Sequence, residues 1–283
     1  MAGTLYLVAT PIGNLGDFSA RGLETLASAD FIAAEDTRVT IKLLNHFGLK
    51  KPMVSYYRHN TDLRGNEIVA RLLAGESCAL VTDAGMPAIS DPGEDLVARC
   101  AAQGIPVTVI PGACAFVSAL ALSGLPTGRF TFEGFLPMNR KNRRAHLDSL
   151  RSETRTMVFH EAPHKLSATL RDLLESFGPD RRISLCRELT KLHEEVRRTT
   201  LREAADYYAA NPPKGEFVLV VEGGVPPEER DYSLEDGVDM VRRLRENGLS
   251  TRDAVKEAAA AMDLPKKALY DRVIGKTSPD PSL

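Results

Sequence analysis

The segment Val81–Gly93, VTDAGMPAISDPG, combines residues that could bind a polar ligand. Asp83 ends an apolar run typical of a buried strand, and a glycine and two prolines follow it. A rigid loop of this kind offers backbone polar groups and a carboxylate beside an apolar floor, as a pocket for an adenosine-bearing ligand requires. The alternative is a stiff surface turn in which Asp91 caps the next helix, and capping is favoured for Asp91 alone.

Two further loops of small and turn-forming residues follow predicted strands. Ala9–Asp17, ATPIGNLGD, comes after the first apolar run, and Ile110–Ala115, IPGACA, follows a later one. Such residues let backbone approach a ligand closely at the carboxyl ends of strands. Neither loop is a G-x-G-x-x-G phosphate loop, so dinucleotide binding is not indicated. Each could be an ordinary turn, but three such loops in one half-sheet predict a common crevice.

Ionisable side chains gather in two segments of the second half, Phe159–Lys165 and Cys186–Glu195. His160 and His164 are four residues apart, but Pro163 between them argues against a continuous helical face that could hold a metal ion. No metal site is expected.

The densest basic cluster lies in the middle of the chain and comprises Arg140, Lys141, Arg143, Arg144, Arg151 and Arg155. Phosphate binding would explain it, because cations that neutralise phosphates release counterions. A solvated helix face explains it equally well. Weaker candidates of the same kind are Arg38 with Lys42, and Lys256 with Lys266, Lys267 and Lys276.

The elements that must position these residues alternate between strand and helix in the first half of the chain. Apolar runs predict strands over 4–9, 31–34, 53–57, 78–82 and 107–110, with helices from about 19, over 37–47 and over 92–102. Such alternation predicts a mostly parallel sheet covered by helices.

Beyond a helix ending near Gly124 the pattern changes. Strands are expected over 130–135, 156–160, 183–187, 196–201 and 217–221, with helices over 164–177 and 202–210, and several strands follow one another directly. A mixed second half is therefore predicted. Gly223–Arg230 is typical of a linker, and three short amphipathic helices over 234–245, 251–261 and 266–274 fit a helix-turn-helix unit. The predicted domains are 1–115, 116–224 and 225–283.

Composition narrows the class of protein. The 283 residues are 43% hydrophobic and 26% charged, as in globular proteins with a sizeable core. The net charge of -2 argues against coating nucleic acid by bulk electrostatics, so any RNA contact must be local. The four scattered cysteines suggest neither a disulfide framework nor structural zinc. The sequence shows no secretory signal and no membrane span, and a cytoplasmic location is expected.

Seven ordered motifs resemble the tetrapyrrole-methylase superfamily, and within it the members that methylate ribosomal RNA. They are LYLVATPIGNLGD from Leu5, AEDTR from Ala34, LLNHFG from Leu43, TDAGMPAISDPG from Thr82, SGLPTGRFTFEGFLP from Ser123, CRELTKLHEE from Cys186 and GEFVLVVEG from Gly215. The resemblance runs from about residue 3 to 223, and a family-like helical tail follows.

The resemblance implies an α/β, tetrapyrrole-methylase-like two-domain fold with a small C-terminal helical unit, a homodimer, and an S-adenosyl-L-methionine site between the two α/β domains. Carried onto matching positions, the implied cofactor contacts are Thr10, Pro11, Ile12, Asp83, Ala84, Gly85, Ile89, Cys114, Ala115, Glu161 and Leu189. Three positions depart from the family pattern. Ala113-Cys114 replaces the common Pro-Ser, His160 replaces tyrosine and Met86 replaces threonine.

The implied activity is 2′-O-methylation of a cytidine ribose in the decoding region of 16S ribosomal RNA, within the small ribosomal subunit. A general base near the acceptor hydroxyl would help, and the candidates are Asp36, Glu161 and Lys191. Each could equally be a structural ion-pair partner. The candidate RNA contacts are Arg38, Arg140, Lys141, Arg143 and Arg144. The alternatives are methylation of a small molecule such as a tetrapyrrole, and a ribosome-binding module that has lost catalysis.

Overall fold

The computed structural model describes residues 2–225 and 232–275. The chain forms two compact units, Met1–Gly224 and Val225–Leu283, each with its own hydrophobic core. Most of the predicted linker Gly223–Arg230, and Lys276, lie outside the described residues.

The first sheet is entirely parallel, as the alternation of strands and helices predicts. Its five strands run in the order β3-β2-β4-β1-β5. Their bounds are β1 Leu5–Val8, β2 Phe31–Ala34, β3 Met53–Ser55, β4 Cys78–Val81 and β5 Val107–Ile110. The order places β1 between β4 and β5, so the turns that follow these three strands leave the same edge of the sheet.

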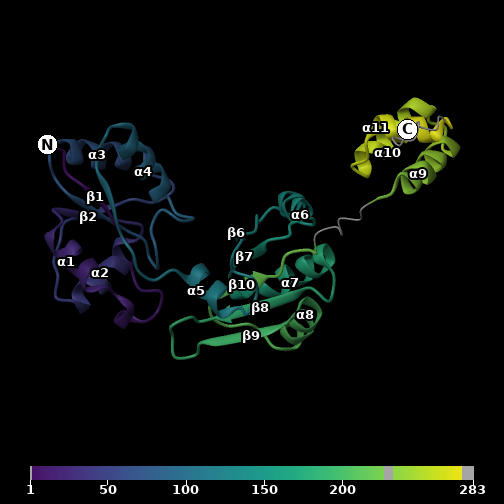
Figure 1. Cartoon of the computed structure of the whole chain (residues 1–283). Coiled ribbons are helices and arrows are strands. Elements are labelled where there is room, and N and C mark those ends of the chain that lie inside the picture. The colour runs from purple at the N-terminus through teal and green to yellow at the C-terminus, as the bar shows by residue number, and fades with distance from the viewer. Residues whose placement is uncertain (1, 226–231, 276–283) are drawn as a thin grey trace. The chain divides into compact units, whose positions relative to one another are not determined.

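Helices cover both faces of this sheet. Alternate residues of β2 enter different clusters: Phe31 and Ala33 pack with α3 (Thr61–Leu73) and α4 (Gly93–Ala102), whereas Ile32 and Ala34 pack with α1 (Ala20–Ser28) and α2 (Thr37–His46). Figure 1 shows α1 and α2 on one side of the strands and α3 and α4 on the other. Burial on both faces explains why the strands are uniformly apolar.

Helix α3 has no counterpart in the sequence prediction. Its apolar residues Ile68, Val69 and Leu72 are buried, but its first two turns are polar and contain Gly65. Glycine disfavours a helix, so the segment resembles a loop. Gly65 lies close to α4, since an added Cβ would lie 3.3 Å from the Arg99 side chain.

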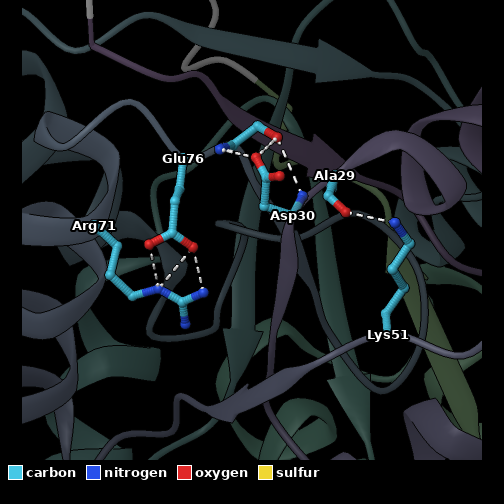
Figure 2. A network of polar contacts seen from close by, with 6 residues as sticks. Ala29, Asp30, Lys51, Arg71 and Glu76 are labelled. Atoms are coloured by element: carbon cyan, nitrogen blue, oxygen red, sulfur yellow. Dashed lines mark hydrogen bonds and ion pairs between the residues drawn. The ribbon is translucent and has the colours of Figure 1, made fainter.

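A polar network holds the amino ends of β2 and β4, at the edge of the sheet opposite the turns (Figure 2). Asp30 accepts hydrogen bonds from the backbone N and the Oγ of Ser77, each at 2.7 Å. Arg71 pairs with Glu76 through two nitrogens and lies 3.5 Å above the Phe31 ring. Lys51 donates to the Ala29 carbonyl at 2.7 Å. These contacts fix the register of the sheet away from the candidate site.

The second sheet is mixed, as predicted, with the order β6-β7-β10-β8-β9. Its strands are β6 Phe130–Phe135, β7 Thr156–Glu161, β8 Arg182–Arg187, β9 Glu195–Thr200 and β10 Phe217–Val221. Only β6 and β7 pair in parallel, with a bulge between Phe132 and Gly134. The connecting elements are α5 Ala115–Leu122, α6 Arg140–Ser149, α7 Pro163–Phe177 and α8 Leu201–Ala210, and a short 3-10 helix, η1, spans Leu15–Asp17.

Two separate cores lie on the two faces of this sheet. One packs α6, α7 and α8 against the strands. The other packs Ala119 and Leu120 of α5 against Val158, Val218 and neighbouring residues, and Ile12 from the first half joins it. The β1 turn therefore packs against the core of the second half through Ile12.

The helical unit consists of α9 Leu234–Glu246, α10 Thr251–Ala261 and α11 Lys266–Val273 (Figure 1). Val255 and Leu269 lie at the centre of its core. Ser233 and Asp236 form a capping box that begins α9, and Ser250 caps α10. Among the described residues no helix is both long and apolar enough to cross a membrane.

Candidate functional site

Three turns of the first half meet at one edge of the parallel sheet. Thr10 and Gly85 exchange two backbone hydrogen bonds, at 2.9 and 3.0 Å, which join the β1 turn to the β4 turn. A Cβ added at Gly85 would lie 3.2 Å from Ile12 and 3.4 Å from the Ala113 carbonyl oxygen of the β5 turn. The turns at Pro11, Asp83 and Cys114 therefore converge rather than face separate surfaces.

The Asp83 carboxylate is fixed by the neighbouring β2 turn. Its Oδ1 accepts a hydrogen bond from the backbone N of Asp36 at 3.0 Å. Burial raises the pKa of Asp83, and the nearby Glu35 carboxylate adds to the rise. Glu35 is held in place by the β4 turn, because the Thr82 hydroxyl donates a hydrogen bond to its carboxylate at 2.6 Å.

Two cavities meet at these turns, of about 360 and 470 Å³. The smaller cavity is bounded by the β1 and β4 turns and by α2, and the larger by the second sheet and α7. Both are lined by Ile12, Ala84, Lys191 and Glu216, so these four residues stand between them. The larger volume falls within the range of small-molecule sites.

Two loops at the site hold an apolar residue between two left-handed residues. Leu189 lies between Glu188 (φ 51°) and Thr190 (φ 66°), and Ile89 lies between Ala88 (φ 66°) and Ser90 (φ 64°). Left-handed backbone is energetically unfavourable for non-glycine residues. It persists where surrounding contacts impose it, commonly at ligand sites. Leu189 is buried and lines the larger cavity, whereas Ile89 is 46% exposed.

The larger cavity contains a carboxylate held on both oxygens. Glu161 is 4% exposed, and its Oε1 accepts from the backbone N of Ala162 at 2.8 Å. Its Oε2 accepts from the hydroxyl of Thr169 on α7, which is fully buried. The same hydroxyl accepts from Arg143 Nη2 at 2.7 Å, and Arg143 Nε donates to Asp172 at 2.5 Å. Arg143 on α6 thus reaches Glu161 through Thr169.

The protonated side chain of Lys191 lies between the two cavities. Its Nζ donates to Glu216 at 2.8 Å and to Glu188 at 3.0 Å. Burial alone would lower the pKa of Lys191, but these two carboxylates outweigh burial and raise it. A Cβ added at Gly13 would lie 2.4 Å from Lys191 Cγ, so the glycine makes room for the lysine stem.

The Asp36 side chain binds the backbone at the start of α2 and lines neither cavity. Its side chain caps α2 by accepting from the backbone N of Arg38 at 2.8 Å, and it pairs with the Arg38 guanidinium at 2.6 Å. The Arg38 contacts lower the pKa of Asp36 to about 2.

His160 lines the larger cavity with a free ring nitrogen. Its ring meets Phe132 and Phe135 edge to face, at 5.3 and 5.4 Å between centroids. The Nε2 atom is buried and has no hydrogen-bond partner among the described residues. Burial lowers the pKa of His160, so the ring stays neutral.

The residues carried over as cofactor contacts fall into three groups. Thr10, Pro11 and Asp83 line the smaller cavity, Ala115, Glu161 and Leu189 line the larger one, and Ile12 and Ala84 line both. Gly85, Ile89 and Cys114 belong to the converging turns but line neither cavity.

The predicted RNA contacts differ in their exposure and in their ion pairs. Arg140 and Lys141, in the first turn of α6, are exposed and have no ion pair with another described residue. Arg144 is 67% exposed and lies 3.8 Å or more from its acidic neighbours. Arg38 is exposed but paired with Asp36. Arg143 is only 12% exposed, because its guanidinium points into the α6–α7 contact.

Several lining residues were not identified from the sequence. Val39, Thr40 and Leu43 enter the smaller cavity from α2. Phe135 reaches the larger one from β6, and Glu216, just before β10, lines both. A helical period places Val39 and Leu43 on one face of α2, and this could have been noticed. Nothing local to Phe135 or Glu216 indicates a site. No group of three or more metal-binding side chains occurs within residues 2–225 and 232–275.

Two known families match the chain. Residues 4–205 match the Tetrapyrrole (Corrin/Porphyrin) Methylases, and residues 233–276 match the RsmI C-terminal HTH domain. The first match spans the parallel sheet, the converging turns and strands β6 to β9 of the second sheet, and it ends before β10.

Similar proteins cover nearly the whole chain. It is 50% identical over 268 residues to the ribosomal RNA small subunit methyltransferase I of Synechocystis sp., covering 95% of this chain and 96% of that protein. It is 48% identical over 272 residues to the protein of the same name from Halalkalibacterium halodurans, covering 95% and 94%.

Among solved structures, the methyltransferase CobJ gives a TM-score of 0.60 at 18% identity, covering 79% of this chain and 95% of that one. Diphthine synthase also gives 0.60, at 17% identity, covering 80% and 92%. At these identities the likeness shows a common fold.

Proposed function

The chain belongs to the tetrapyrrole methylase family, and from this premise we propose that it is an S-adenosylmethionine-dependent methyltransferase of 16S ribosomal RNA. The proposed reaction is 2′-O-methylation of a cytidine ribose in the decoding region of the small ribosomal subunit. The relatives that match along 95% of the chain are named as ribosomal RNA small subunit methyltransferases, and this supports the substrate.

The observation that carries the proposal is the meeting of turns from both halves of the chain around two adjoining cavities. The larger cavity offers apolar walls from Ala115, Leu189 and Val218 for a flat purine, beside a set of ionisable side chains. The fixed Asp83 carboxylate, which lines the adjoining smaller cavity, suits a cationic amino acid group. The residues present therefore fit S-adenosylmethionine, and all eleven contacts named from the resemblance are retained as proposed contacts.

When bound, S-adenosylmethionine supplies a methyl group activated by a sulfonium. The chain's contribution is to hold the acceptor hydroxyl close and aligned, which is worth up to about 7–11 kcal/mol in well-oriented systems. The two cavities suggest how, with the purine in the larger one, the amino acid group at Asp83 in the smaller one, and the acceptor ribose approaching Ile12 and Ala84, which line both.

The three proposed bases differ in how well they suit that role. Lys191 remains protonated between Glu216 and Glu188 and cannot accept a proton. Asp36 is engaged in capping α2, outside both cavities. Glu161 lines a cavity, but hydrogen bonds engage both of its oxygens. We therefore assign Lys191 and Glu161 to positioning, and Asp36 to holding the backbone that fixes Asp83.

The exposed part of α6 is the proposed RNA contact of the α/β unit. Arg140, Lys141 and Arg144 lie in its first turns, where the helix dipole disfavours positive charge. No ion pair within the described residues compensates Arg140 and Lys141. An anionic partner such as the RNA backbone would compensate them.

A homodimer is also proposed. The edge strand β5 exposes Val109, the adjoining α5 exposes Val117 and Leu122, and β6 exposes Phe130, each between 37 and 48%. Exposed apolar side chains on neighbouring elements are typical of a protein interface. Light scattering of purified protein, compared with a Val117→Glu variant, tests it. A cytoplasmic location, where ribosomes assemble, is proposed with this function.

Transfer of labelled methyl groups to small subunits that lack the modification tests the proposed function. Mass spectrometry of the RNA should place one methyl group on a cytidine 2′-oxygen. Label on a base, on ribosomal protein, or nowhere would refute the proposal.

A further inference from the structure

The helical unit carries a cationic hollow of its own. A cavity of about 550 Å³ lies between α10 and α11 and is lined by Arg252, Lys266, Lys267 and Tyr270. All four side chains belong to exposed residues, and Tyr270 is 40% exposed. We call these four residues the α10–α11 patch.

The cations of the α10–α11 patch are not neutralised by the protein. None of the three forms an ion pair with a described residue, although other arginines of the same unit do. Arg242 pairs with Asp239 at 3.1 Å, and Arg272 pairs with Glu235. Arg243, Arg245 and Lys256 also lack an ion pair with a described residue, but they do not line this hollow, where three unpaired cations lie together.

The placement of these residues has a cost that the fold does not explain. Lys266 and Lys267 begin α11, where the partial positive charge of the helix end repels them, and the Pro265 cap supplies no side-chain hydrogen bond. The core contact of α11 is made by Leu269, so neither lysine is needed to bury the helix. Tyr270 lies one turn after Lys266 and exposes an aromatic face that the core does not use.

We propose that the α10–α11 patch binds RNA, with Arg252, Lys266 and Lys267 contacting phosphates and Tyr270 stacking on an unpaired base. The inference rests on the proposed function and extends it, because it gives the helical unit its own contact with the RNA substrate. A cationic hollow with an aromatic platform is typical of sites for single-stranded nucleic acid. In helix-turn-helix proteins, too, the second helix presents its first turn to nucleic acid.

An acidic protein surface would pair with the three cations but would offer no base to stack on the Tyr270 ring, so RNA is favoured over a protein partner. The distinction is measurable. Each lysine–phosphate contact releases counterions and makes log K depend on log salt, with a slope of about 0.7 per phosphate for a single strand. Loss of stacking on Tyr270 should weaken binding roughly 5- to 150-fold with little change in that slope.

The test uses the full chain and two probes, protein-free 16S ribosomal RNA and intact small subunits. The variants are Lys266→Ala with Lys267→Ala, and Tyr270→Ala. The matched control is Arg242→Ala with Arg243→Ala, which removes two charges from α9. We expect the lysine pair to lose affinity for both probes and about 1.4 from the salt slope. Tyr270→Ala should lose affinity at an unchanged slope, and the control should lose less than either.

The outcomes separate this proposal from the proposed function. Calorimetric affinity for S-adenosylmethionine should be unchanged in all variants. If wild-type protein binds the RNA through the patch but methylates no ribose, the proposed activity fails and the patch stands. If both patch variants bind as the control does, the patch proposal is overturned. It is also overturned if affinity falls for subunits but not for protein-free RNA, because the partner would then be a ribosomal protein.

Discussion

The hydroxyl of Thr169 connects the proposed cofactor pocket to the basic helix, and its removal gives the sharpest test of the site. Thr169→Val keeps the branched shape of the side chain and replaces the hydroxyl by a methyl group. Glu161 Oε2 then loses its donor, and Arg143 Nη2 loses its acceptor at 2.7 Å. Arg143 keeps its contact with Asp172, so the damage is confined to the link.

The magnitude follows from burial. Thr169 is 0% and Glu161 4% exposed, so water cannot easily replace the lost bond. A buried polar group left without its partner costs about 1–3 kcal/mol. With two such groups, one of them able to relax, we expect roughly 2–3 kcal/mol less unfolding free energy. For a unit of this size that corresponds to a melting temperature roughly 4–12 °C lower.

The same substitution should loosen Glu161 within the larger cavity and raise the dissociation constant for S-adenosylmethionine about fivefold or more, the equivalent of one hydrogen bond. Calorimetric titration measures the affinity, and thermal unfolding followed by tyrosine fluorescence measures the stability. Thr169→Ser retains the hydroxyl and should restore the affinity.

A second buried threonine provides the matched control. Thr156 is 2% exposed on β7 and donates to the Pro126 carbonyl at 2.6 Å, and it lines neither cavity. Thr156→Val should lower stability and leave cofactor affinity as it is. Equal affinities for Thr169→Val and wild type would refute the positioning of Glu161 by the hydroxyl.

Three further predictions concern the site and its surroundings. Asp83→Ala should weaken cofactor binding by about 5- to 150-fold, as loss of a polar contact to a charged group does, and affect RNA binding less; calorimetry showing unchanged affinity would contradict it. Arg140→Glu with Lys141→Glu should lower methyl transfer to small subunits at unchanged cofactor affinity, whereas Arg143→Glu should impair both, in assays that vary one substrate at a time. His160→Phe should remove part of the acid sensitivity of folding: burial lowers the pKa of His160 in the folded state, so its contribution is present above the ordinary value of 6.5 and is lost as pH falls below it. Melting temperatures of wild type and His160→Phe between pH 7.5 and 5 test this. The wild type should lose stability faster as the pH falls, and parallel curves would contradict the prediction.

The parallel sheet could be predicted because its strands are short, apolar and separated by regular helices. Phe31–Ala34 and Val107–Ile110 are strands with the bounds that the pattern predicts. Helix α3 could not, since its stability comes from packing Ile68, Val69 and Leu72 under the sheet rather than from its own composition. The strand order also depends on contacts between distant segments, which periodicity does not encode.

The candidate site was predictable as far as it is built from loops at strand ends. The turns at Pro11, Asp83 and Cys114 have a composition that indicates close backbone approach, and the structure brings them together. The second half contributes through tertiary contacts instead. Glu216 precedes an ordinary apolar strand, and only the fold places it opposite Lys191 at 2.8 Å.

The basic cluster shows that residues that look alike in the sequence can differ in their contacts. Arg143 lies four residues before the buried Leu147, and its guanidinium meets α7, whereas Arg140 and Arg144 are exposed. Arg143 then meets Thr169, and through it the Glu161 carboxylate. The proposed RNA contact on α6 and the proposed cofactor pocket are thus linked by hydrogen bonds through Arg143 and Thr169. We expect binding at one site to change the affinity at the other, by the same factor in each direction.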